Sequence, residues 1–321
     1  MTNLFTRVPL LLAATALALG GATAASPGAS AAGLPAQYRL PDPTAYPESI
    51  TRQPGTDTIY VTSFVNGTVY RGSLHEPDLH PFIPGDAAHP SANGVKADRH
   101  GHLFVARGTA QLVDVYRASD GTLLSELSTA GFDTGSFLND LVVTPDGSVY
   151  VNDSSRPNVF RIHQDERGRF AIERWLDLTG SVFKYQSGPG LAGANANGIV
   201  ASHDGRHLLI GTTNTGRLYR IDTATKQVIE VDLGGATYPY IDGMNLSGHT
   251  LYMARNAADR VTALRLNADW SRGTLHADLA DPRFAFPSSV LPANGRLLVA
   301  EFQYNRTSPT LPFTIDAIPL P

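Results

Sequence analysis

The feature that most constrains the fold is a pattern that the chain repeats six times. Each copy starts with a polar residue, continues through a short apolar run, and reaches a turn glycine six to eight residues after its first residue. The first residues, which we call the head residues, are Glu48, Asn93, Asn139, Asn197, Asp242 and Ser288. The head residues are separated by 45, 46, 58, 45 and 46 residues. The turn glycines are Gly55, Gly101, Gly147, Gly205, Gly248 and Gly295.

Short apolar or β-branched runs that end at glycine turns are typical of β-hairpins. A repeat of about 40 to 50 residues with hairpin turns and almost no helical periodicity predicts propeller blades. The sequence therefore predicts an all-β fold, a six-bladed β-propeller with four-stranded blades. The last copy lacks outer strands, so we expect a strand over 36–40 to complete it beside a strand over 313–318. The other outer strands are expected near 81–83, 123–127, 175–178, 228–233 and 275–279.

Residues 1–32 have the pattern of a secretory signal peptide. Arg7 precedes a 12-residue apolar run, 8–19, and small-residue Ala-x-Ala matches follow at 22–24 and 29–31. The run is too short to span a membrane. We therefore predict a signal peptide over 1–32, a propeller over 33–321, and export to the extracellular space or periplasm.

The charge and the cysteine count exclude several classes of function. The net charge of −4, with no cluster of Lys or Arg, argues against nucleic acid or a membrane surface as the partner. The absence of cysteine excludes disulfides, zinc thiolate sites and thiol catalysis. We expect a small-molecule substrate and a monomeric protein.

Four head residues suggest a metal site. The innermost strands of a propeller line its axis, so equivalent repeat positions converge there. Glu48, Asn139, Asn197 and Asp242 offer two carboxylates and two amide oxygens, which suit a hard divalent cation. Ca²⁺ is the preferred ion, with Zn²⁺, Mn²⁺ and Mg²⁺ as alternatives. Each Asn-Gly or Asp-Gly pair taken alone is also a common turn signal.

The longest interval between head residues contains an additional segment, 181–196. Its Gly188 to Gly193 stretch matches G-x-G-x-x-G, but the strand and helix of a dinucleotide-binding unit are not expected around it. We expect instead a mobile loop that leads into Asn197 and forms a lid over the central pocket.

The motifs around these heads resemble a known family. Pro-Glu-Ser at Glu48, Leu-Asn-Asp at Asn139, Ala-Asn-Gly at Asn197 and Ile-Asp-Gly at Asp242 are similar to the four metal-ligand motifs of the senescence-marker-protein (regucalcin)/gluconolactonase family. The similarity covers nearly the whole chain after residue 32. It implies a six-bladed propeller with a divalent ion in its central channel and hydrolysis of lactones or related esters. It also implies that Asp242 acts as the general base.

Two related propeller families share this architecture, and the chain departs from each pattern. The stretch 149–155 resembles a strictosidine-synthase blade motif. Paraoxonase-like proteins carry Ser-x-His-Gly where this chain has Ser91-Ala-Asn93-Gly94, so that histidine base is missing. Phe137 stands where the gluconolactonase-type sugar binders have arginine, which favours a more apolar substrate. The candidate substrate-contacting residues are Asn93, Phe137, Asp140 and Ser288.

Three hypotheses for the function follow. The first is a secreted metal-dependent lactonase or esterase in which the cation polarises the carbonyl and Asp242 activates water. The second is a non-catalytic secreted propeller with a structural calcium ion that binds a protein, peptide or glycan. The third is a lyase of the strictosidine-synthase type. Asp140 is a candidate for orienting the metal ligand Asn139, or for accepting the backbone hydrogen bonds of a turn.

Overall fold

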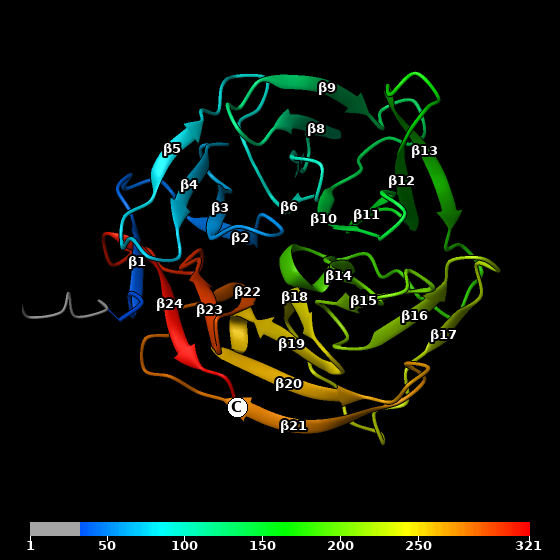
Figure 1. Ribbon diagram of the computed structural model, residues 1–321. Helices are drawn as coiled ribbons and strands as arrows, with labels where there is room; N and C mark the ends of the chain where they lie inside the picture. The colour runs from blue at the N-terminus through cyan, green and yellow to red at the C-terminus, as the bar shows by residue number, and fades with distance from the viewer. Residues whose placement is uncertain (1–32) are drawn as a thin grey trace, which may run out of the picture. The chain divides into compact units, whose positions relative to one another are not determined.

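Residues 33–321 are described by the computed structural model, in which six four-stranded antiparallel sheets form a β-propeller (Figure 1). The predicted all-β, six-bladed fold with four-stranded blades is therefore confirmed. The predicted signal peptide over 1–32 lies outside the described residues. Within 33–321, no helix combines the length and apolar character needed to cross a membrane.

Each blade runs from an innermost strand at the axis to an outermost strand at the rim (Figure 1). The innermost strands are β2 (Pro47–Arg52), β6 (Val95–Ala97), β10 (Leu138–Val143), β14 (Ala196–Ala201), β18 (Ile241–Ser247) and β22 (Pro287–Ala293). The second strands are β3 (Thr58–Ser63), β7 (His102–Ala106), β11 (Val149–Asp153), β15 (His207–Thr212), β19 (Thr250–Arg255) and β23 (Arg296–Glu301).

The third and fourth strands complete the blades. The third strands are β4 (Val69–Ser73), β8 (Leu112–Arg117), β12 (Asn158–Gln164), β16 (Leu218–Asp222), β20 (Arg260–Leu266) and β24 (Phe313–Pro319). The outermost strands are β5 (His80–Ile83), β9 (Leu123–Ser128), β13 (Phe170–Asp177), β17 (Val228–Glu230), β21 (Gly273–Leu279) and β1 (Gln37–Leu40). Two short 3-10 helices, η1 (Gly190–Ala192) and η2 (Asn256–Ala258), lie in connections.

The two ends of the described chain meet in the sixth blade. β1 pairs antiparallel with β24, from Gln37 opposite Asp316 to Leu40 opposite Phe313, so the blue and red strands lie side by side in Figure 1. This confirms the predicted closure by an N-terminal strand. It removes the open edge that the last blade would otherwise expose.

The predicted outermost strands are found in all of the first five blades, with one substantial error of position. The third blade was expected to end with a strand near 175–178, whereas β13 covers Phe170–Asp177. The missed residues are mostly half-buried and carry two charges, so they show little apolar signal. Their strand conformation comes from pairing with β12 instead.

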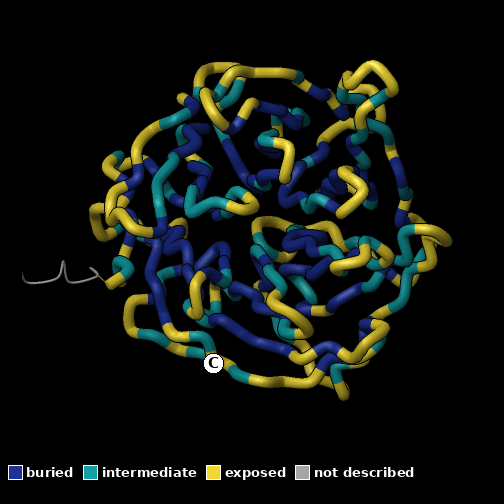
Figure 2. Tube along the Cα trace, viewed as in Figure 1, coloured by how far each residue is buried: buried dark blue, intermediate teal, exposed yellow. Residues whose placement is uncertain are grey.

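The hairpin turns and the core agree with the repeat pattern. All six turn glycines have a left-handed φ, from +59° at Gly248 to +87° at Gly147, a conformation that glycine adopts at little cost. The recurrent strand aromatics are buried between blades, as predicted: Tyr60, Phe104, Tyr150, Tyr219 and Tyr252. Figure 2 shows this buried interior and the exposed connections at the rim.

Candidate functional site

The head residues lie where the innermost strands are irregular. The pairing of the innermost with the second strand shifts register at Pro47/Ile50, Leu138/Leu141, Ala196/Ile199, Ile241/Met244 and Pro287/Ser289. In the second blade, β6 begins at Val95, two residues after Asn93. A bulge redirects the side chains of the residues within it. The irregularity therefore turns the heads out of the sheets and toward the axis.

The glycines that follow three heads allow neighbouring blades to approach closely. A Cβ added to Gly94, Gly198 or Gly243 would lie 2.7, 2.4 or 2.8 Å from a backbone oxygen of the next blade's head. Gly198 and Gly243 lie inside strands β14 and β18. The common turn interpretation of an Asn-Gly or Asp-Gly pair is therefore wrong at these two positions, where glycine serves inter-blade packing.

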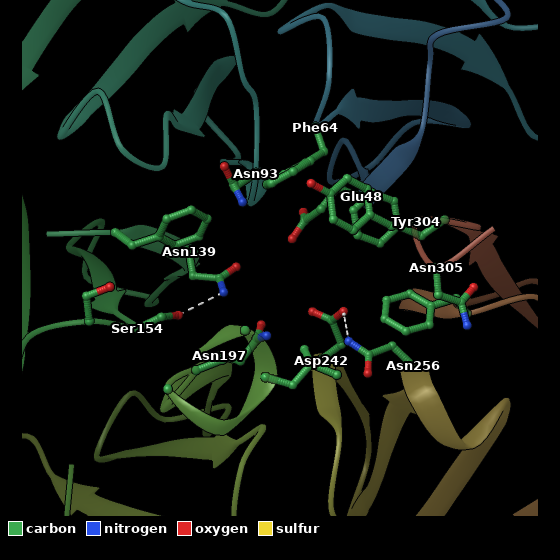
Figure 3. Close-up of a pocket in the computed structure, with 18 of the residues that line it drawn as sticks. Glu48, Phe64, Asn93, Asn139, Ser154, Asn197, Asp242, Asn256, Tyr304 and Asn305 are labelled. Carbon is green, nitrogen blue, oxygen red and sulfur yellow. Dashed lines mark hydrogen bonds between the residues drawn. The ribbon is translucent and has the colours of Figure 1, made fainter. Parts of the chain in front are cut away.

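The four predicted ligand residues line one pocket of about 480 Å³. In Figure 3 the carboxylates of Glu48 and Asp242 and the amides of Asn139 and Asn197 point toward the same central space. Each residue comes from a different blade, and all four are buried. Residues almost two hundred positions apart in sequence thus meet at the propeller axis, as the repeat pattern requires.

Two hydroxyl groups orient the amides. Asn139 Nδ2 donates to Ser154 Oγ (2.9 Å), and Ser154 Oγ in turn donates to the backbone oxygen of Ala196. Asn197 Nδ2 donates to Thr213 Oγ1 (3.0 Å), which donates to Ile241 O (2.7 Å). Because both hydroxyl protons are committed to backbone oxygens, the amide NH₂ groups must face the hydroxyls. The amide oxygens are left for the pocket.

One of these oxygens is a buried acceptor without a partner. Asn139 Oδ1 is inaccessible to solvent and accepts no hydrogen bond from any described residue. A buried unsatisfied acceptor costs about 1 to 3 kcal/mol, so its presence in a native site calls for an explanation. A cation bound between the heads would satisfy it.

The two carboxylates lie in an environment that disfavours their negative charge. Burial raises the pKa of Asp242 to about 7, although hydrogen bonds from Asn256, whose Nδ2 donates to Asp242 Oδ2 (2.8 Å), and from the Asn197 side chain oppose the shift. Burial, reinforced by the charges of Asp242 and Asp140, raises the pKa of Glu48 well above its ordinary value, and Lys96 partly opposes this. Two buried carboxylates whose negative charges are destabilised in this way would be stabilised by a bound cation.

The residues present therefore fit a divalent cation. Two carboxylates and two locked amide oxygens form an all-oxygen donor set of the kind that Ca²⁺ prefers. Glu48, Asn139, Asn197 and Asp242 would hold the ion. The preference for Ca²⁺ over Zn²⁺, Mn²⁺ or Mg²⁺ stays a prediction from donor chemistry.

The four candidate substrate-contacting residues divide into two pairs. Asn93 and Phe137 line the pocket. Asn93 Oδ1 accepts from Ser91 Oγ (3.1 Å), and its amide nitrogen faces the central space in Figure 3. Asn93 therefore offers a hydrogen-bond donor, the opposite orientation to Asn139 and Asn197.

The second pair has other partners. Among the described residues that line the pocket, neither Asp140 nor Ser288 occurs. Asp140 Oδ1 accepts from Lys96 Nζ (3.0 Å) and from the backbone nitrogen of Leu141 (2.8 Å). Ser288 Oγ donates to Pro47 O (3.0 Å) and is buried. Both side chains therefore support the packing of the inner strands rather than the pocket surface.

The segment 181–196 borders the pocket, as the lid prediction requires, through Gly188, Gly190, Leu191, Gly193 and Ala194. Its far end is fastened by buried Asn195. The Nδ2 of Asn195, with two hydrogens to donate, lies within hydrogen-bond distance of Ser154 O, Gln186 O and Gly193 O, and its Oδ1 accepts from Gln186 N. The mobility of this segment stays a prediction.

Sequence reasoning missed the residues that hold the heads in place, namely Ser154, Thr213 and Asn256. They share a positional signal, because each is a polar residue 14 to 16 positions after its head: the separations are 15, 16 and 14. In the first blade Thr62 plays a related part, since its Oγ1 donates to Asn93 O (2.6 Å). Aligning the repeats past the turn glycine could have found this second polar position.

A separate ionic cluster lies outside the pocket lining, between strands β8 and β9 of the second blade and the connection that precedes this blade. His89, Asp114 and Glu126 bring possible ligand atoms within 4.8 Å of one another. Asp114 already pairs with buried Arg107, whose Nε lies 2.7 Å from Asp114 Oδ2. His89 also contacts Asp86 at 2.9 Å. His89 also lies 3.1 Å from Glu126, so these residues form an ion-pair network.

Comparison with known proteins supports the fold. No protein-family model matches the sequence, and no curated protein matches it. The structure is similar to an inactive variant of virginiamycin B lyase from Staphylococcus aureus with quinupristin, at 13% identity and a TM-score of 0.59, over 88% of this chain and 83% of that one. The chain has the propeller fold of that lyase. It is likewise similar to a streptogramin B lyase structure, at 12% identity and a TM-score of 0.55, over 88% of this chain and 97% of that one.

Two further similar structures are not described as lyases. A luciferin-regenerating enzyme matches at 13% identity and a TM-score of 0.60, over 88% of this chain and 93% of that one. The major allergen Mala s 1 of Malassezia sympodialis matches at 13% identity and a TM-score of 0.66, over 88% and 96%. At these identities the likeness establishes the propeller fold. Beyond this fold, the resemblance to the regucalcin/gluconolactonase family stays a prediction.

Proposed function

We propose that the protein is a secreted metal-dependent hydrolase of lactones or related esters. The observation that carries the proposal is the locked donor set at the axis. Asn139 and Asn197 are held with their amide oxygens free, one of them unpartnered, beside the buried carboxylates of Glu48 and Asp242. This arrangement suits a divalent cation, Ca²⁺ by preference, at the bottom of an accessible pocket.

The chemistry of the site follows from its residues. When bound, such a cation polarises an acyl carbonyl and stabilises the negative charge that develops on its oxygen. Asn93 directs an amide N–H into the pocket and can donate to the same carbonyl or to a neighbouring ester oxygen. Asn256 holds Asp242 Oδ2 and thereby fixes the orientation of that carboxyl group.

Asp242 is the proposed general base. Burial raises the pKa of its carboxyl group in the metal-free protein. A bound cation would lower that pKa and keep Asp242 ionised, as a base must be at neutral pH. Asp242 takes a proton from water while the water oxygen bonds to the acyl carbon. The acyl carbon–oxygen bond then breaks, and Asp242 returns the proton to the departing alkoxide. The products are a carboxylic acid and an alcohol, or one hydroxy acid from a lactone.

The first test is a screen of lactones and aryl esters with and without a chelator, repeated on Glu48→Gln. The proposal predicts hydrolysis that the chelator abolishes and that added Ca²⁺ restores. Glu48→Gln should need far more Ca²⁺ for the same rate. Hydrolysis that persists in the chelator would contradict the metal-dependent part of the proposal.

A lyase reaction is the second candidate. Two of the similar structures are lyases, and Asp242 is a buried carboxylate in a pocket with many apolar residues. The products separate the two reactions. Hydrolysis in ¹⁸O-labelled water places the label in the acid product, whereas elimination forms a carbon–carbon double bond without taking up the label. A structural calcium ion without catalysis is favoured if the ion binds but no substrate is turned over.

A further inference from the structure

The walls of the pocket differ chemically from its floor. We call Glu48, Asn93, Asn139, Asn197 and Asp242 the floor. Four aromatic residues of the first and sixth blades, which we call the aromatic wall, stand beside it: Phe64, Phe286, Phe302 and Tyr304. Figure 3 shows Phe64 and Tyr304 on the same side of the central space as Glu48.

The aromatic wall is one packed surface. The Phe302 and Tyr304 rings are stacked, with centroids 5.0 Å apart and planes 13° from parallel. The Phe64 ring meets both edge-on, at 5.5 and 5.1 Å, and Phe286 lies 6.1 Å from Phe302. Aromatic pairs at these separations stabilise one another. The wall therefore presents a preformed apolar surface.

The opposite sides of the pocket are also apolar. Phe137 precedes β10 of the third blade, which lies across the six-bladed ring from the sixth. Its ring is packed near Gly108, where an added Cβ would lie 3.4 Å from the ring. The segment 181–196 contributes Leu191, Ala194 and three glycines, whose side chains offer no hydrogen-bonding group.

The polar groups that a bound molecule can contact are concentrated at the floor of the pocket. Ser154 and Asn256 are already engaged with floor residues. The remaining polar lining side chains, those of Ser155 and Asn305 and the hydroxyl of Tyr304, belong to residues exposed to solvent. A bound molecule therefore meets hydrogen-bonding groups at one end and apolar surface around its body. A sugar-like body would leave several hydroxyl groups without partners against the walls, which is costly.

We infer that the pocket selects lactones and esters whose body is flat and apolar, such as an aryl or alkyl ring system, and rejects sugar-acid lactones. This inference rests on the proposed function for the reaction, but the apolar selectivity concerns the walls alone. Phe137, Phe302 and Tyr304 are the specificity-determining residues. The acyl group of the substrate lies at the floor, and the rest of the molecule lies between the aromatic wall and Phe137.

The substrate test compares dihydrocoumarin with gluconolactone at saturating Ca²⁺. An unpaired hydroxyl or a missing apolar contact each change kcat/KM by roughly 10- to 100-fold. We therefore expect dihydrocoumarin to be preferred by at least about 100-fold in kcat/KM. Equal efficiency, or a preference for gluconolactone, would overturn the inference.

Two wall variants test the residues. Tyr304 is 53% exposed, so Tyr304→Ala should fold normally and raise KM for dihydrocoumarin about three- to tenfold with little change in kcat. Phe137→Leu should act in the same direction. Phe132→Ala is the control, because Phe132 is also an exposed aromatic residue but does not line the pocket. Wall variants that match the control in KM would contradict the assignment.

A non-hydrolysable ligand separates this inference from the proposed reaction. β-Tetralone has the shape of dihydrocoumarin with a ketone in place of the ester, and calorimetry measures its binding without turnover. Binding that weakens in Tyr304→Ala but not in Phe132→Ala supports the inference even if no lactone is hydrolysed, in which case only the proposed reaction fails. Absence of β-tetralone binding to the wild-type protein overturns the inference, whatever the hydrolysis screen shows.

Discussion

The floor and the walls of the pocket are built in different ways. The floor residues occupy one equivalent position in successive blades, and the bulges and inter-blade glycines of the inner strands place them at the axis. The wall residues come from irregular connections, such as Phe64 after β3 and Tyr304 between β23 and β24. The repeat therefore determines which polar groups lie at the axis, while the connections determine the shape and polarity of the molecules that can bind there.

The largest expected effect is on the floor, from Asp242→Asn. Loss of a general base lowers a rate by about 100- to 10,000-fold, so kcat at saturating Ca²⁺ should fall within that range. β-Tetralone binding, which depends on the walls, should change little. Glu301→Gln is a matched control, since burial also raises the pKa of Glu301, to about 9, but Glu301 lies outside this pocket. A kcat within threefold of wild type would show that Asp242 is not the base.

The next effect concerns the residues that hold the floor. Ser154→Ala removes the hydroxyl that fixes the Asn139 amide, so the amide oxygen is no longer held toward the axis. Removing a hydrogen bond that orients a metal ligand weakens metal binding by about 10- to 100-fold. Calcium titration measures the loss, with Ser155→Ala, the exposed neighbouring serine, as the control. Equal affinities in the two variants would mean that the amide needs no such support.

A smaller effect is the pH dependence of the stabilisation by calcium. In the metal-free protein the pKa of Asp242 is about 7, against roughly 3.9 in an unfolded chain. Between these values the folded state binds more protons, so the free energy of unfolding falls as the pH rises through this window. A cation displaces the proton and offsets that loss.

The rise in Tm on adding Ca²⁺ should therefore be larger at pH 8 than at pH 5. Glu301 contributes a pH dependence of the same sign with and without calcium, so it cancels in the difference between the two melting curves. A calcium effect that is equal at both pH values, or larger at pH 5, would contradict the assignment of Asp242 as a ligand.

The smallest effect is expected from the segment 181–196. Leu191→Ala removes apolar surface from one side of the pocket, and we expect KM for dihydrocoumarin to rise about two- to fivefold. Calcium affinity should not change. Val182→Ala is the control, because Val182 lies in the same segment, is 48% exposed and does not line the pocket. A change in calcium affinity would show that floor and walls are not independent.

The same comparison explains what the sequence could predict. The blades and their turn glycines recur along the sequence, and β1 completes the last copy of the recurring pattern. A single sequence is therefore enough to predict them. The convergence of Glu48, Asn139, Asn197 and Asp242 follows from the same periodicity. Their orientation does not, because Ser154 and Thr213 act through hydrogen bonds to the backbone of the next blade.

Most of the residues that form the walls could not be predicted from the sequence, for a related reason. Phe137 lies two residues before a head. Phe302 and Tyr304 lie 14 and 16 positions after the head Ser288, but their aromatic side chains do not follow the polar pattern that other blades show at these positions. Only the closed ring brings them together with Phe64, more than two hundred residues earlier. Asp140 and Ser288 were expected at the substrate because they adjoin or occupy head positions, yet their side chains are engaged with Lys96 and Pro47.

The most direct test of the central claim is a calorimetric titration of Ca²⁺ into the metal-free protein and into Glu48→Gln. We predict one ion per chain in the wild-type protein and an affinity at least tenfold weaker in the variant. The absence of binding to the wild-type protein, or equal affinity in both proteins, would contradict the claim that the head residues form a cation site at the propeller axis.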